Sequence, residues 1–309
     1  MNRRPLIAVV GNCQARPLAQ ALASVVDGGA DIATVAIVHL LKDDDETTYA
    51  SAFAAADLIV AQSVADTYPC RFVQTHTLRS RYGAKVLTWP NLYFGGYNPE
   101  LMYLRGPDRQ PIRGPLGDYH SANFLAGWQR GLDVSATLAL HADEDYNRIH
   151  YEGAPERAMQ ELERREAATD VHVCAWIRER LWRTRLFFTF NHPAFALVHE
   201  TARQLCERSG LACTQTPVVV ADAKEPLGQF RTPMNPWIRR VQASTLIEAE
   251  DYAGVELLAL EPGRVVVGKH RRYAPVEVIE AFFRVYEACG NELPTIPSAM
   301  VPHHRETKP

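Results

Sequence analysis

The fold of this chain is decided by the stretch Pro5-Leu6-Ile7-Ala8-Val9-Val10-Gly11-Asn12-Cys13-Gln14-Ala15-Arg16. Its apolar half predicts a buried strand, Gly11 predicts a turn, and the Ala/Leu-rich residues that follow predict a helix. Cys13 would then lie at a helix N-terminus, where outward-pointing backbone N–H groups favour negative charge. Because a thiol with a free pKa of about 8.5 can fall to roughly 3.5–7.5 in such a place, we expect an activated sulfur.

Alternating strands and helices continue through the first hundred residues. The predicted strands are Leu6–Val10, Ile32–Val38, Leu58–Ala61 and Ala84–Thr88, and the predicted helices are Arg16–Val26, Thr47–Ala56 and Tyr68–Tyr82. This alternation predicts a parallel sheet, in which ligands bind beyond the carboxyl ends of the strands. Three loops should therefore converge at one edge of the sheet: the residues 11–14, the pair Gln62-Ser63, and the residues 89–94.

The chain becomes more helical after this unit. Residues 89–118 are rich in Pro, Gly and Tyr and predict a long irregular segment, which is either a functional loop or a plain crossover with buried tyrosines. Helices are predicted at Tyr119–Arg130, Pro155–Leu186, Pro193–Ser209, Pro233–Thr245 and Val276–Ala288, interrupted by short strands at Phe187–Phe190, Val218–Val220 and Val265–Val267.

These patterns predict an α/β fold that is predominantly helical. We expect a small parallel-sheet subdomain, Rossmann-like or SGNH-like, over residues 1–100. A larger, mainly helical region over residues 101–293 should be merged with it, and residues 294–309 should form a loose tail.

Composition excludes several classes of protein. The 309 residues carry a net charge of −3, which argues against nucleic acid as the main partner. Six cysteines without a CxxC pair argue against a zinc site and fit a reduced cytoplasmic protein, so we expect no metal. No apolar run approaches the roughly 20 residues of a membrane span, and the apolar run before Gly11 is too short for a signal peptide.

The candidate chemistry centres on Cys13, which could attack a thioester or ester carbon as a nucleophile. Asn12 and Gln14 beside it could donate hydrogen bonds to an oxyanion. The alternative is a small buried cysteine that packs under the helix. No G-x-G-x-x-G, Walker A, H-E-x-x-H or G-x-S-x-G pattern occurs in the sequence.

Two histidines are candidates for the base that a thiol needs. His192 follows a predicted strand, and Pro193 would open the next helix at its first position, so the imidazole should be exposed near a functional edge. A capping or packing histidine is the alternative. His120 is the second choice, because Asp118 is close enough in sequence to orient it, although Asp at a helix start is more often a cap.

The Gly11-Asn12-Cys13-Gln14 turn after the first strand, together with Asn191-His192-Pro193 downstream, resembles the WcbI family of capsular-polysaccharide biosynthesis proteins. The resemblance extends over nearly the whole chain, including the aromatic loop from Asn91 to Pro99. It implies a coenzyme A-binding protein that acts as an acetyltransferase and places O-acetyl groups on a capsule heptose. The first strand and turn also resemble the opening block of SGNH-type hydrolases, with Cys13 in the place of the nucleophilic serine. No GDS block and no late Asp-x-x-His block is present, which argues against simple esterase chemistry.

Coenzyme A carries a pyrophosphate and a 3′-phosphate, which helix N-termini and basic side chains should hold. The basic candidates are Arg16, Arg71, Arg79 and the cluster that contains Lys269, Arg271 and Arg272. The converging loops add Gly11, Asn12, Gln62, Ser63, Asn91 and Tyr93 as further candidates, with the Tyr93-Phe94-Tyr97 segment as one wall of a cleft.

Two mechanisms fit these residues. In the first, Cys13 takes the acetyl group from acetyl-CoA and a sugar hydroxyl then takes it from Cys13. In the second, His192 deprotonates the sugar hydroxyl for direct attack on bound acetyl-CoA, while Cys13 and Gln14 line the oxyanion site. An SGNH-like acetyl-ester hydrolase and a non-catalytic protein that binds coenzyme A or a glycan remain the competing classes.

Overall fold

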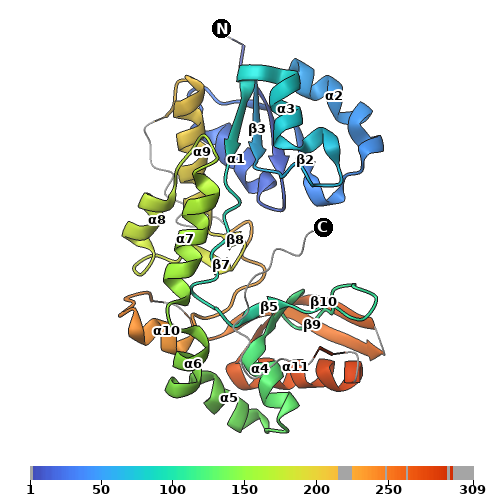
Figure 1. Ribbon diagram of the computed structural model, residues 1–309, viewed down its shortest axis with the longest axis vertical. Helices are drawn as coiled ribbons and strands as arrows, with labels where there is room; N and C mark the ends of the chain where they lie inside the picture. Colours follow the sequence, from blue (N-terminus) through green and yellow to red (C-terminus); the bar gives the residue numbers. More distant parts are fainter. Residues whose placement is uncertain (1–2, 215–224, 248, 262–263, 291–292, 295–309) are drawn as a thin grey trace.

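The computed structural model describes residues 3–214, 225–247, 249–261, 264–290 and 293–294. In Figure 1 the chain forms an upper lobe built on a sheet and a lower lobe built on a β-hairpin, with a set of helices connecting them on one side. The α/β class predicted from the sequence is confirmed. The subdomain boundaries near residues 100 and 293 stay predictions. The predicted tail lies, apart from Pro294, outside the described residues.

The upper lobe contains the predicted parallel sheet. Its strands are β1 (Leu6–Gly11), β2 (Asp31–Ile37), β3 (Leu58–Gln62) and β4 (Val86–Trp89), and they lie in the order β2-β1-β3-β4. All three neighbouring pairs are parallel. The chain passes from β1 to β2 on one side and then to β3 on the other side. The carboxyl ends of β1 and β3 therefore flank a topological switch point, where open α/β sheets bind their ligands.

Helices cover both faces of this sheet because its strands carry apolar residues on both sides. Alternate residues of β1 point to opposite faces, with Ile7 in one buried cluster and Ala8 in another. The helices α1 (Ala15–Val25) and α9 (Phe195–Ser209) cover the first face, and α2 (Glu46–Ala55) and α3 (Thr75–Tyr82) cover the second. Figure 1 shows both layers around the sheet. Short 3-10 turns lie at Val38–Leu40, Asp43–Asp45, Arg71–Val73 and Gly83–Lys85.

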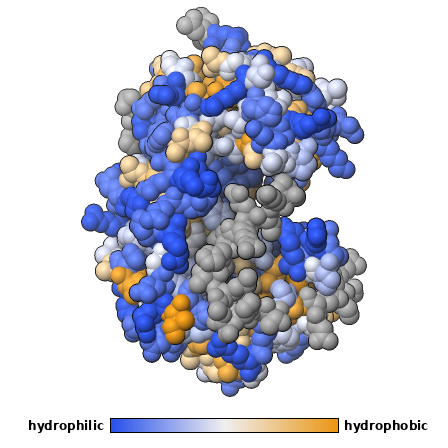
Figure 2. Space-filling model, in the orientation of Figure 1, coloured by the Kyte–Doolittle hydropathy of each residue, from blue (hydrophilic) through white to orange (hydrophobic). Residues whose placement is uncertain are grey.

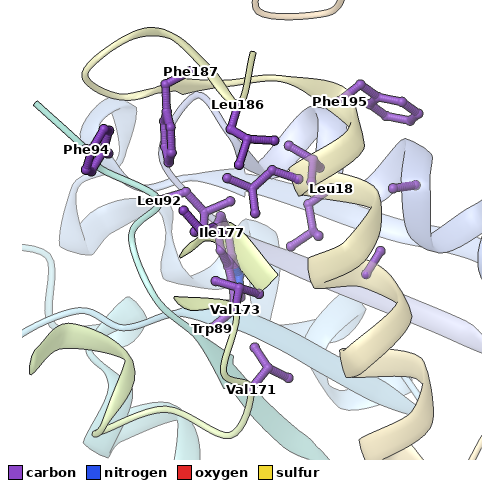
Figure 3. Close-up of a cluster of buried hydrophobic side chains, with 14 of the residues drawn as sticks. Leu18, Trp89, Leu92, Phe94, Val171, Val173, Ile177, Leu186, Phe187 and Phe195 are labelled. Atoms are coloured by element: carbon purple, nitrogen blue, oxygen red, sulfur yellow. The ribbon is translucent and has the colours of Figure 1, made fainter. Parts of the chain in front are cut away.

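The first cluster continues from the sheet into the segment that joins the lobes. Figure 3 shows Leu18 of α1 and Trp89 of β4 beside Ile177 and Phe187, which come from α8 (Cys174–Arg180) and β7 (Phe187–Thr189). The neighbouring elements are α7 (Ala154–Glu166) and β8 (His192–Pro193), which pairs with β7. One continuous core therefore fixes the segment that contains Asn191 and His192 against the sheet.

The lower lobe is built around an antiparallel hairpin of β9 (Tyr252–Glu261) and β10 (Arg264–Tyr273). A second buried cluster joins this hairpin to the helices packed on it. The lobe also contains α4 (Ala122–Gln129), α5 (Val134–Ala142), α6 (Glu144–Tyr151), α10 (Pro236–Val241), α11 (Pro275–Cys289) and the short pair β5 (Leu101–Tyr103) and β6 (Tyr119–Ser121).

Several predicted elements need correction. The single helix expected over Pro155–Leu186 is divided into α7 and α8, because Glu166 accepts hydrogen bonds from the backbone N–H groups of Val173 and Cys174 and so caps the second helix. The predicted strand Val265–Val267 lies in the first half of the longer β10, and its partner β9 was not predicted. The predicted strand Val218–Val220 lies outside the described residues.

The sequence favoured reduced cysteines over a disulfide framework, and for one pair of cysteines this expectation is wrong. Cys206 near the end of α9 and Cys213 are joined by a disulfide. The segment at Cys213 pairs with Val26 at the end of α1, so the bond anchors α9 beside α1.

Among the described residues, no helix is long and apolar enough to cross a bilayer. The face shown in Figure 2 is mainly hydrophilic, with small and separated hydrophobic spots.

Candidate functional site

Amide side chains link the three loops at the carboxyl edge of the sheet. Asn12 follows β1, Gln62 ends β3, and Asn91 follows β4. The backbone N–H of Asn12 donates to Gln62 Oε1 at 3.0 Å, and Asn12 Nδ2 donates to Asn91 Oδ1 at 3.3 Å. Gln62 Nε2 also donates to Asn91 Oδ1, at 3.4 Å. The structure therefore brings together the loops that the sequence predicted would converge at the switch point.

Gln14 is the centre of this network and is fully buried. Its Nε2 donates to the carbonyl oxygens of Leu92 and Asn191, both at 2.8 Å. Its Oε1 accepts from the backbone N–H of Leu92 and from Gln62 Nε2, both at 3.2 Å. Since an amide side chain has two donor hydrogens, both are in use, and the predicted oxyanion role of Gln14 has no donor left. Its position instead joins the first turn to the segment at Asn191.

Gly11 allows this edge to pack closely. A Cβ atom at Gly11 would lie 2.9 Å from the Trp89 ring and 3.3 Å from Gln62 Cβ. A glycine at this position therefore allows β1 to approach the neighbouring side chains of β3 and β4 closely. The neighbouring Ser63 is exposed and uses its backbone N–H for a bond to the Trp89 carbonyl.

Cys13 lies in the turn between β1 and α1 and is partly exposed. The backbone N–H groups of Cys13 and Gln14 hydrogen-bond its sulfur, as expected at a helix N-terminus. Burial outweighs these bonds and raises the pKa of the Cys13 thiol above its ordinary value. The predicted direction of the shift is therefore wrong, because the desolvation of the sulfur is larger than the stabilisation by the turn.

Two phenols lie beside Cys13. Burial raises the pKa of both Tyr103 and Tyr119, and a charge on the Cys13 sulfur adds a smaller shift in the same direction. The three side chains therefore lie within electrostatic range of one another. Tyr119 Oη donates to Asn191 Oδ1 at 2.5 Å, and Asn191 Nδ2 donates to Tyr103 Oη at 3.0 Å. The Asn191 carbonyl is the one that Gln14 holds. The turn at Cys13 and this tyrosine pair are thus joined through one asparagine.

His192 lies next to this group, but not in the way that the sequence predicted. Pro193 pairs with Phe187 in β8, and α9 begins only at Phe195, so His192 does not precede a helix. The ring is 6% exposed and lies 5.5 Å from the Tyr119 ring, edge to face. Burial lowers the pKa of His192 to about 4, while a hydrogen bond to the Leu227 backbone opposes the shift. Its Nδ1 atom is buried and has no hydrogen-bond partner within the described residues.

His120 points to the other side of β6 from Tyr119. It is fully buried in the lower lobe, with Nε2 at 2.8 Å from the Ile112 carbonyl oxygen and Nδ1 at 3.4 Å from Tyr286 Oη. Burial lowers its pKa to about 4. Because a side chain without exposed surface and with both nitrogens bonded cannot reach a substrate, this placement argues against the predicted catalytic role.

Most of the predicted phosphate ligands already have an acidic partner. Arg71 pairs with Asp43, and Arg79 pairs with Asp170 while also bonding Thr88. Arg271 and Arg272 lie on β10 in the lower lobe, paired with Glu277 and Asp251, and Lys269 is exposed on the same strand.

Arg16 differs from these side chains. It is exposed on the first turn of α1, and it makes no ion pair or side-chain hydrogen bond with any residue that the structure describes. Of the predicted cations, Arg16 is therefore the closest to Cys13 in the sequence. Its guanidinium group is available to bind a ligand.

Four residues around the site were missed. Arg165 stacks over the Tyr93 ring at 5.1 Å and donates a hydrogen bond to the Asn91 carbonyl, so it contacts two of the residues that were predicted to bind coenzyme A. Tyr103, Tyr119 and Asn191 complete the group near Cys13. Asn191 stands directly before His192 in the segment that carried the resemblance, and this proximity was the available signal. Tyr103 and Tyr119 had no such signal, because they lie in two strands of three residues each, which are too short to show periodicity.

Across the described parts of the chain, no group of three or more His, Cys, Asp or Glu side chains is arranged to hold a metal ion.

Comparison with known proteins assigns the family. Residues 6–214, more than half of the chain and the whole of the site described above, match the model of a family described as "Polysaccharide biosynthesis enzyme WcbI". The chain belongs to the WcbI family. A comparison with curated proteins found no match.

A solved WcbI structure shares the fold of this WcbI-family chain. The two superpose with a TM-score of 0.69 at 20% sequence identity, over 97% of this chain and 92% of the other. That protein is described as a novel polysaccharide biosynthesis enzyme, in its native form without a disulfide bond between coenzyme A and one of its cysteines. The likeness therefore extends beyond the matched residues to the lower lobe.

Proposed function

We propose that this WcbI-family chain is an acetyl-CoA-dependent O-acetyltransferase that acylates a sugar hydroxyl in capsular-polysaccharide biosynthesis. The observation that carries the proposal is the position of Cys13, partly exposed at the switch point of the sheet and held in a turn fixed by buried amides. The solved WcbI structure is described by reference to a disulfide between coenzyme A and a cysteine. We infer that Cys13 lies beside the coenzyme A thiol in the same way. Since acetyl-CoA is a cytoplasmic metabolite, the reaction would take place there.

Arg16 is the side chain that we assign to the coenzyme A phosphates. It extends from the first turn of α1, where the positive end of the helix dipole adds to its charge. Tyr93, with Arg165 on its face, would then form an aromatic wall for the pantetheine or adenine. Arg71 and Arg79 are less suited, because a phosphate would have to replace Asp43 or Asp170.

The site favours direct transfer over a covalent acetyl-cysteine. A thiol whose pKa is raised by burial is mostly protonated at pH 7, and a thiol is a much weaker nucleophile than a thiolate. His192 is in its neutral form at this pH, so we assign it as the base that takes the proton of a sugar hydroxyl. Cys13 would then line the pocket for the thioester.

The function is tested by titration calorimetry with coenzyme A and acetyl-CoA, followed by transfer of a labelled acetyl group to capsule-type sugars. We expect binding with a micromolar or lower Kd. Arg16→Gln should weaken it about tenfold, roughly 1.4 kcal/mol, with a smaller salt dependence. The matched control Arg71→Gln should bind like the wild type. The proposal fails if neither ligand binds at two temperatures, or if the labelled acetyl group is released only to water.

Cys13→Ala separates the two routes. For direct transfer we expect kcat/KM to fall by no more than about tenfold, because a lining contact is lost and the base remains. For an acetyl-cysteine route the loss should be about a thousandfold or more, since the nucleophile itself is absent. Steady-state transfer measures this difference. Denaturing mass spectrometry of the quenched wild-type reaction should show no acetylated Cys13, and an acetyl adduct there would contradict direct transfer.

A further inference from the structure

Tyr103 ends β5 and is turned toward the site. Its ring packs edge-on against Phe190 at 4.9 Å and lies 5.5 Å from the Tyr119 ring. The side chain is nevertheless 44% exposed, and it is among the most exposed large hydrophobic residues of the structure. It therefore combines a fixed ring with an accessible edge near Cys13.

The hydrogen bonds of Asn191 determine which group of Tyr103 is free. The 2.5 Å separation between Tyr119 Oη and Asn191 Oδ1 is typical of an O–H···O bond and is too short for N–H···O. The other end of the amide, Nδ2, must then face Tyr103, where it lies 3.0 Å from the phenol oxygen. An amide nitrogen only donates, so the Tyr103 oxygen is the acceptor in this bond and keeps its own hydrogen for another partner.

The Tyr103 phenol stays protonated at physiological pH. Burial raises the pKa of Tyr103 to about 12, although the hydrogen bond from Asn191 opposes the shift. The hydroxyl is consequently a donor over the whole range in which an acyltransferase works. Because Asn191 is anchored through its carbonyl to Gln14, the donor is held in a fixed relation to the turn at Cys13.

We propose that Tyr103 is a catalytic residue whose O–H donates a hydrogen bond to the carbonyl oxygen of the acyl group bound beside Cys13. This inference rests on the proposed transferase function. The sugar hydroxyl oxygen forms a bond to the thioester carbon, and the carbonyl π electrons move to its oxygen. When the intermediate collapses, that electron pair re-forms the carbonyl and the C–S bond breaks. The coenzyme A sulfur leaves with the bond electrons and takes up the proton that the hydroxyl released.

Tyr103 suits this role better than the donors next to Cys13. Both hydrogens of the Gln14 amide are bound to carbonyl oxygens, and one of the two hydrogens of Asn12 Nδ2 is bound to Asn91. A donor that is already positioned when negative charge develops stabilises it without reorganisation. Loss of one such donor typically reduces kcat by about 10²–10³-fold.

The test compares the full-length wild type with Tyr103→Phe, which keeps the ring and removes the hydroxyl. We expect kcat for acetyl transfer to fall about 10²–10³-fold, with the Kd for coenzyme A changed less than about twofold. Bound acetyl-CoA labelled with ¹³C at the carbonyl should show a resonance displaced to lower field in the wild type and closer to the free ligand in the variant. The matched control is Tyr49→Phe on α2. This residue packs against the buried cluster on the second face of the upper-lobe sheet, and the variant should behave like the wild type.

The outcomes separate this inference from the function on which it rests. If Tyr103→Phe has the wild-type kcat and the wild-type ¹³C chemical shift of the bound carbonyl, the role of Tyr103 is overturned. The proposed transferase function would then still stand. A wild-type protein that binds no acetyl-CoA would overturn both. Thermal unfolding of each variant shows whether the fold is retained, which we expect because the ring contacts of Tyr103 are kept.

Discussion

Replacing Gln14 by glutamate is expected to lower the free energy of unfolding by about 3–5 kcal/mol. The change is nearly isosteric but removes both donor hydrogens. The carbonyl oxygens of Leu92 and Asn191 would lose their partner, and a carboxylate would lie against them in a fully buried place. Urea unfolding at pH 7 measures the loss, and activity should disappear with the geometry of the turn.

The stability of the same Gln14→Glu variant should depend on pH in a distinctive way. Burial beside two carbonyl oxygens should raise the pKa of the introduced carboxyl above its unfolded value. The folded state then binds more protons, so the variant should gain stability as pH falls from 7 toward 4.5. The matched control is Gln20→Glu, at an exposed position of the same helix, which should change the unfolding free energy by less than about 0.5 kcal/mol. Equal effects at both positions would contradict the assignment of Gln14 as the centre of the network.

His192→Gln is expected to reduce kcat/KM for acetyl transfer by about 10²–10⁴-fold, the usual contribution of a general base. The pKa of His192 is about 4, so the base form dominates at neutral pH. Wild-type kcat/KM should therefore be constant from pH 8 to about pH 5 and fall below that, as the ring is protonated. The variant should lose this acid limb. This difference is measured by recording kcat/KM for acetyl transfer as a function of pH for both proteins, with acetyl-CoA at saturating concentration.

Stability must be followed in the same samples, because His192 is buried. Its pKa is lower in the folded state than the ordinary value of 6.5, so the wild type should lose part of its stability as pH falls from about 6.5 toward 4. His76→Gln is the control, since His76 is exposed on α3 and pairs with Asp66. A wild-type acid limb with an apparent pKa near 6.5, or a limb that persists in His192→Gln, would contradict His192 as the base.

The parallel sheet could be predicted almost to the residue, because its strands are short continuous apolar runs with helices between them. The predicted Leu58–Ala61 and the observed β3 differ by one residue. The hairpin of the lower lobe could not be predicted in the same way. In β9, Gly254 and Glu256 interrupt the apolar pattern, and the strand exists because it pairs with β10 and packs against α11.

The site could be predicted in its parts that are local in sequence. The turn after β1 and the meeting of Asn12, Gln62 and Asn91 follow from the order of a parallel sheet. The environments of the side chains cannot be predicted from that order. Cys13 is buried enough to raise its pKa, and Tyr103 and Tyr119, which lie within electrostatic range of it, come from a distant part of the chain. Pro193 is typical of a helix start in the sequence, but pairing with Phe187 determines its conformation.

The frame around Cys13 consists of carboxamides: Asn12, Gln14, Gln62, Asn91 and Asn191. None of these groups gains or loses a proton between pH 3 and 11, roughly the range over which acidic and basic side chains titrate, and none carries a net charge that ions could screen. The shape of the turn should consequently be the same in acid and in base, and in dilute buffer and in concentrated salt. Within the pH range in which the fold keeps its stability, a change in catalysis or ligand affinity with acidity or ionic strength then belongs to other groups of the protein, above all the reacting ones, and not to these carboxamides.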